Sequence, residues 1–140
     1  MFRVLGSIYL IGSGGCLSRL AHEALIPNGS LRQIGLARKI PEPDLWCYSS
    51  PRYQFNLDEI DDEVRSFLHA HPKVTQALLN QQKGVQYAMF VICPVAQNEE
   101  DMFAGALSNE TLQALAASGL ALEIAPAPVM PDAEPWRSKD

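Results

Sequence analysis

Four small residues, Gly12-Ser13-Gly14-Gly15, separate a segment typical of a β-strand from one typical of a helix. A dinucleotide site places glycines at such a junction because backbone amides at the helix start must approach a pyrophosphate. The pattern G-x-G-G-x-x-S lacks the last glycine of that motif, and no acidic ribose ligand follows a second βα unit. The sequence therefore favours a structural glycine turn, with a small-molecule or nucleotide-binding domain as the alternative.

The other reactive side chains do not form a recognisable catalytic or metal-binding pattern. Cys16, Cys47 and Cys93 are widely spaced and include no C-x-x-C pair, so they indicate neither a disulfide framework nor a zinc site. His69 and His71 would point to different faces of a helix, and they are better placed to interact with its terminal carbonyls. No G-x-S-x-G nucleophile elbow is present. We therefore expect no enzyme, no cofactor and no metal.

Acidic residues gather at two places, 58–63 and 99–101. The first cluster opens an expected helix, where the dipole favours negative charge, so it does not require a catalytic explanation. If the fold brings both clusters together, they form a negative patch that would attract a basic protein. The acidic residues predicted to bind a partner are Asp58, Asp61, Asp62, Glu99, Glu100 and Asp101.

Aromatic and arginine side chains form a second candidate binding surface: Trp46, Tyr48, Arg52 and Tyr53 lie within eight positions of one another. Trp, Tyr and Arg are enriched at the energetic centres of protein interfaces. Core packing would explain Trp46 and Tyr48, but it explains Arg52 and Tyr53 less well. We predict that these four residues contact a protein partner.

Patterning of apolar residues predicts the elements that would position these side chains. Asn56, with Glu59 three residues later, predicts a capping box; Pro72 separates two helices; Ser108 and Gly119 begin and end another. Residues 30–43 fit a short helix or a loop equally well. The expected strands are 3–11, 44–49, 85–95, 103–107 and 120–125, and the expected helices follow residues 15, 56, 72 and 108.

This order predicts an α+β fold with a single mixed or mostly antiparallel sheet of about five strands and helices mainly on one face. The strand 85–95 is apolar on both faces, which is typical of a central strand. We expect one domain over residues 1–125. Four prolines between 126 and 135 predict an extended or disordered tail over 126–140.

Composition narrows the classes of partner. The chain has 140 residues, 47% of them apolar, and a net charge of −5, which argues against sequence-independent nucleic-acid binding. No apolar run approaches the ~20 residues that span a bilayer. Residues 1–16 have some features of a lipoprotein signal, although Gly6 and Ser7 interrupt the apolar stretch. We expect a cytoplasmic protein, of undetermined oligomeric state.

The stretch Pro43-Asp44-Leu45-Trp46-Cys47-Tyr48-Ser49-Ser50-Pro51, with the acidic helix, the 85–93 strand and the Leu107-Ser108…Gly119-Leu120 segment, resembles a bacterial family called domain of unknown function 4279. The resemblance supplies no catalytic residue. It implies a small bacterial cytoplasmic protein of a kind suspected to include immunity proteins. We therefore expect a non-enzymatic binding protein that neutralises a basic toxin through its acidic and aromatic surface.

Overall fold

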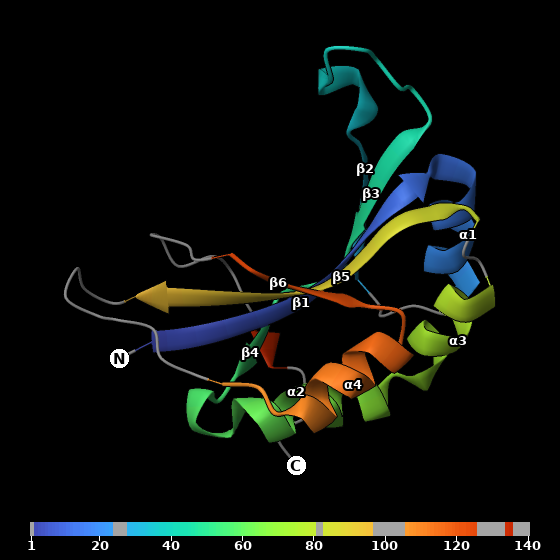
Figure 1. The fold of residues 1–140 in the computed structure, drawn as a ribbon. Coiled ribbons are helices and arrows are strands. Elements are labelled where there is room, and N and C mark those ends of the chain that lie inside the picture. Colours follow the sequence, from blue (N-terminus) through green and yellow to red (C-terminus); the bar gives the residue numbers. More distant parts are fainter. Residues whose placement is uncertain (1, 24–27, 81–82, 97–105, 126–133, 136–140) are drawn as a thin grey trace.

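The computed structural model describes residues 2–23, 28–80, 83–96, 106–125 and 134–135 (Figure 1). Seven strands form one sheet, and the described ranges also contain four α-helices and two short 3₁₀ helices. In chain order the elements are β1 (Phe2–Ser13), α1 (Gly14–Glu23), β2 (Ser30–Gln33), η1 (Gly35–Ala37), β3 (Leu45–Ser49), β4 (Tyr53–Phe55), η2 (Leu57–Glu59), α2 (Ile60–Ala70), α3 (Pro72–Asn80), β5 (Val85–Ala96), α4 (Asn109–Ala117), β6 (Ala121–Ile124) and β7 (Glu134–Pro135).

The long strands β1 and β5 form the centre of the sheet, where they pair antiparallel along most of their length. On its other side, β1 pairs with β3 through residues 9–13 and with β4 through residues 4–6. Ser50, which lies between β3 and β4, also contacts β1, because its hydroxyl accepts a hydrogen bond from the Ile8 amide at 2.8 Å. The segment considered as a lipoprotein signal is therefore the middle of the sheet, and its removal would separate β3 and β4 from β5.

The short strands lie at the outside of the sheet. β2 pairs antiparallel with β3, β6 pairs parallel with β5, and β7 pairs parallel with β4. The expected tail thus contributes the two residues of β7 to the sheet. β2, β4 and β7 were not predicted, and residues 103–105 of the strand expected at 103–107 lie outside the described residues.

All four α-helices contribute to one apolar core on one face of the sheet (Figure 1). From the sheet, Ile8 and Leu10 of β1 and Phe90 of β5 point into this core. The ring of Phe67 on α2 lies at its centre, 5.7 Å from the ring of Phe90. The α+β class, the mixed and mostly antiparallel sheet and the helices on one face are confirmed.

Local signals at the helix ends were largely correct. Ser108 accepts a hydrogen bond from the Thr111 amide at the start of α4, and Gly119 adopts a φ of 77° just beyond its end. His71 Nδ1 lies 2.8 Å from the Phe67 carbonyl oxygen at the end of α2, as expected for a histidine near free carbonyls.

The capping box was predicted correctly for Asn56 and wrongly for Glu59. Asn56 accepts a hydrogen bond from the Asp58 amide, but Glu63 rather than Glu59 approaches the Asn56 amide, at 3.4 Å. The reason is the 3₁₀ turn η2, which is inserted between the cap and α2 and moves Glu59 away from the position that closes the box.

Candidate functional site

Three of the four aromatic and arginine residues predicted to bind a partner pack on the helix-covered side of the sheet. Tyr48 and Tyr53 belong to the buried core, with 3% and 7% of their surface exposed. Trp46 packs against the same core. Burial, with a smaller contribution from neighbouring Tyr53, raises the pKa of Tyr48 to about 12. Tyr48 and Tyr53 therefore are not surface anchors, because their side chains fill space between the sheet and the helices.

Arg52 is the member of this group that is exposed. It lies between β3 and β4, close enough to the Cys93 thiol to affect its ionisation. Burial raises the pKa of Cys93, and the Arg52 charge partly opposes that effect. Arg52 therefore remains available for a contact, but without the aromatic neighbours that were expected to accompany it.

The carboxylate of Asp61 connects α2 to the start of α4. It accepts hydrogen bonds from the Ser108 amide at 2.6 Å, the Ser108 hydroxyl at 2.9 Å and the Thr111 hydroxyl at 2.8 Å. The hydrogen bond from the Ser108 amide, followed by the one from Thr111 and assisted by Arg65, holds the pKa of Asp61 below its usual range. Asp61 is thus part of the joint between two helices.

The neighbouring acidic residues are used in the same way. Arg65 pairs with Asp62 and with Glu110 of α4, the latter at 2.8 Å, while Glu63 is buried. Asp58 is exposed at the start of the helical region. The second acidic cluster, Glu99, Glu100 and Asp101, lies outside the described residues. The expected negative patch is therefore reduced, because Asp61 and Asp62 hold positively charged or hydrogen-donating groups of this same chain.

The segment Gly12–Gly15 does not form a loop. Gly12 and Ser13 end β1, and Gly14 begins α1 directly. The Ser13 amide donates to the Gly84 carbonyl at 3.0 Å and the Gly14 amide to the Asp44 carbonyl at 3.1 Å. The Asp44 carboxylate also lies 3.3 Å from the Gly14 amide. A phosphate would have to displace these contacts and meet a negative charge, so the geometry opposes the nucleotide alternative.

The glycines are required by close packing instead. A side chain on Gly12 would collide with the Gly84 carbonyl, and a Cβ on Gly14 would lie 2.7 Å from the Trp46 indole. By contrast, a Cβ on Gly15 would meet no atom within 4 Å. A structural role therefore explains Gly12 and Gly14 but not Gly15. That role is close packing where the strand meets the helix, and not the turn that was expected.

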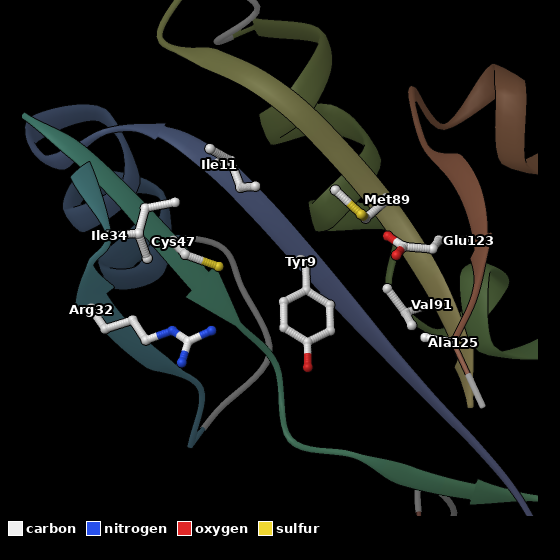
Figure 2. A pocket seen from close by; sticks show the side chains of 9 residues that line it. All are labelled: Tyr9, Ile11, Arg32, Ile34, Cys47, Met89, Val91, Glu123 and Ala125. Carbon is white, nitrogen blue, oxygen red and sulfur yellow. The ribbon is translucent and has the colours of Figure 1, made fainter. Parts of the chain in front are cut away.

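The face of the sheet opposite the helices contains a cavity of about 290 Å³ (Figure 2). Its position follows from the register: Ile11 pairs with Cys47, which pairs with Arg32, and Tyr9 pairs with Met89. Directly paired residues point to the same face of a sheet. The residues that line the cavity are Tyr9, Ile11, Arg32, Ile34, Cys47, Met89, Val91, Glu123 and Ala125.

The cavity is apolar in its middle and charged at its two sides. Figure 2 shows the Arg32 side chain extending toward Tyr9 from β2, and Glu123 on β6 at the opposite side. β3, β1 and β5 lie between these two edge strands, so Arg32 and Glu123 do not pair with each other. Within the described part of the chain, Arg32 makes no ion pair.

A second exposed feature is the far end of the β2–β3 hairpin, which rises away from the helices in Figure 1. Leu36 in η1 and Ile40 in the following loop are 61% and 79% exposed. Below them, the Gly35 carbonyl accepts hydrogen bonds from the Arg38 amide at 3.4 Å and the Glu42 amide at 3.1 Å. The hairpin thus exposes two large apolar side chains to solvent on a hydrogen-bonded segment. We call Leu36 and Ile40 the hairpin tip.

Sequence reasoning did not identify the cavity or the hairpin tip. Residues 30–43 were ambiguous between helix and loop, and no pattern in them indicated an edge strand. The isolated apolar residues Leu36 and Ile40, among the charged residues and prolines of 36–44, were an available signal for the tip. The cavity gave no such signal, because its residues lie in or directly after five strands that are far apart in the sequence.

Two further observations concern metal ions and membranes. Among the described residues, no group of three or more histidine, cysteine, aspartate or glutamate side chains is placed to hold a metal ion. Likewise, none of the helices in the described ranges is both long enough and apolar enough to cross a membrane.

Comparisons with protein-family models, curated proteins and solved structures found no match to this chain. The resemblance to domain of unknown function 4279 therefore stays a prediction.

Proposed function

We propose that this chain is a non-enzymatic binding protein that recognises another protein through the tip of its β2–β3 hairpin. The observation that carries the proposal is the exposure of Leu36 and Ile40 together on a projecting, hydrogen-bonded hairpin. Transfer of such side chains from water into an interface is favourable, by about 25 cal/mol per Å² of apolar surface. Two large apolar side chains held exposed on one projecting element are therefore a candidate protein interaction site.

The arrangement of ionisable groups supports the non-enzymatic part of the proposal. In the cavity, Arg32 and Glu123 come from the edge strands β2 and β6, with β3, β1 and β5 between them. The Asp61 carboxylate is occupied by hydrogen bonds from Ser108 and Thr111. A general acid or base must reach the proton that it transfers, and Asp61 is held by these contacts instead.

The partner surface differs from the one expected from the sequence. Tyr48 and Tyr53 are buried and Asp61 and Asp62 are paired within the chain, so the hairpin tip replaces them. Neutralisation of a toxin by a bacterial cytoplasmic protein remains the most specific form of this proposal. Coexpression with a candidate toxin tests it: survival with the wild type, but not with a hairpin-tip variant, is the supporting result.

The general proposal is tested by photo-crosslinking from a benzoylphenylalanine placed at Ile40, with the same group at Leu112 on α4 as the control. Both positions carry exposed apolar side chains, but they lie on different elements. We expect a protein from the host to crosslink at position 40 and not at 112. After purification, that protein should bind the wild type and L112D equally, and I40D at least tenfold more weakly.

Equal binding to I40D and wild type would contradict the proposal. Light scattering of the purified chain distinguishes binding to another protein from self-association. A homo-oligomer that dissociates on I40D substitution would make the hairpin tip a self-association surface.

A further inference from the structure

The cavity on the helix-free face is a separate feature from the hairpin tip, and its lining defines a particular chemistry. Its middle is built from apolar side chains of the neighbouring strands β3, β1 and β5, namely Cys47, Ile11, Met89 and Val91. Ile34 and Ala125, just after β2 and β6, extend this apolar lining. Small-molecule sites typically combine such a lining with a few placed polar groups. A hydrocarbon group would therefore be favoured in the middle of this cavity.

The polar groups are placed asymmetrically. Arg32 is the one basic residue among the described residues that line the cavity, and its guanidinium extends toward the Tyr9 ring in Figure 2. A guanidinium presents a fork of N–H donors that matches the two oxygens of a carboxylate. The Tyr9 hydroxyl is a second donor near this side of the cavity. Neither residue has another partner within the described ranges that would have to be displaced.

Glu123 disfavours negative charge at the side of the cavity opposite Arg32. Its carboxylate would repel a second negative charge on a ligand that extends across the cavity from Arg32. A phosphate ester or a dicarboxylate would thus leave part of its charge without a partner, whereas a monocarboxylate would not. The volume of about 290 Å³ is at the lower end of the range for ligand sites, which limits the ligand to a small molecule.

We infer that this cavity binds a small amphipathic monocarboxylate, whose carboxylate contacts Arg32 and the Tyr9 hydroxyl while its hydrocarbon part covers Ile11, Cys47 and Met89. The inference goes beyond the proposed protein-binding function, because it uses a different surface and different residues.

Calorimetric titration of the full chain with octanoate, 1-octanol and octyltrimethylammonium at low ionic strength tests the inference. The three probes share a hydrocarbon chain and differ in the charge of the head group. Octanoate should bind most tightly and octyltrimethylammonium least tightly. R32Q should weaken octanoate binding about tenfold and leave octanol binding unchanged, because it removes one charge-assisted contact at an open site.

Matched variants separate the cavity from general charge effects. R38Q removes a positive charge from the same hairpin, outside the cavity lining, and should leave octanoate binding unchanged. Y9F should weaken octanoate binding by a smaller factor than R32Q, and E123Q should strengthen it. Thermal unfolding without ligand establishes that each variant is folded, and R32K serves as a second variant if R32Q is not.

Four results would overturn the inference: no octanoate binding, equal affinity for octanoate and octanol, tightest binding of octyltrimethylammonium, or the same loss of affinity in R38Q as in R32Q. The hairpin-tip variant I40D should bind octanoate normally, so failure of one proposal is distinguishable from failure of the other.

Discussion

The two faces of the sheet are built from alternate residues of the same strands, yet they are used differently. Ile8 and Leu10 of β1 point into a core that four helices cover, whereas Tyr9 and Ile11 between them line an open cavity. The covered face contains close ring contacts and glycines without room for a side chain. The second face also carries buried residues, such as Leu5 and Val95 at 1% exposure, so it contributes to stability as well. Its partly exposed cavity residues, such as Tyr9 and Met89, can be substituted at less cost to the fold than the residues of the covered core.

The largest expected effect comes from the centre of the covered face. Phe67 is fully buried, with its ring 5.5 Å from Tyr53 and 5.8 Å from Phe55. F67A should lower the free energy of unfolding by about 3–5 kcal/mol, because it removes buried area and leaves a cavity. Urea denaturation measures this loss. M89A on the open face is the comparison and should cost about 1 kcal/mol; equal losses would contradict the division between the faces.

An intermediate effect is expected where β1 meets α1. G12A should destabilise the chain by about 1–3 kcal/mol, since the new methyl group collides with the rigid Gly84 carbonyl. G15A, three residues later in α1, should be neutral or stabilise by up to about 1 kcal/mol, because space is available and alanine favours helix. Thermal unfolding of both variants checks the pair. A stable G12A would show that close packing does not require this glycine.

A smaller effect, with a pH signature, is expected at the joint between α2 and α4. Because the folded state lowers the pKa of Asp61, its contribution to stability is present above its unfolded pKa of about 3.9 and disappears as the pH falls through the folded pKa. D61N should therefore lower the urea midpoint at pH 7 and reduce its dependence on pH below about pH 5. A D61N midpoint with the wild-type pH dependence would exclude this role for Asp61. D58N, at an exposed position, is the control.

The smallest effect on stability is expected outside both faces, at the hairpin tip. I40D should change the free energy of unfolding by no more than about 0.5 kcal/mol, because Ile40 is 79% exposed. Partner binding should nevertheless weaken at least tenfold. Chemical denaturation checks the first expectation, and the crosslinking experiment checks the second. Marked destabilisation by I40D would instead mean that Ile40 supports the fold.

Several parts of the fold could be predicted from local sequence. Ser108 and Gly119 bound α4, Pro72 separates α2 from α3, and the apolar run at 85–95 forms a central strand. Short edge strands could not be predicted in this way. All four residues of β2 are exposed, so no apolar alternation marks them, and their strand geometry depends on pairing with β3.

The candidate sites were harder to predict for the same physical reason. Asp61 was assigned to a surface patch because its partner Ser108 lies 47 residues away in the sequence. Tyr48 and Tyr53 have the residue type of interface anchors, but β3 and β4 place them beneath the helices. The charge of a side chain is known from the sequence, but only the fold shows which distant group pairs with it or donates a hydrogen bond to it.

The sequence by itself determined the α+β class, both ends of α4, the break between α2 and α3 and the central strand, because these depend on periodicity and capping over a few neighbouring residues. Only the tertiary structure decided which face of each strand is covered, which carboxylates are paired and which glycines pack against backbone. It also brought Tyr9, Arg32 and Glu123 to one cavity. Those relationships depend on strand register between distant segments, and register is fixed by the packing of the whole sheet rather than by any local pattern.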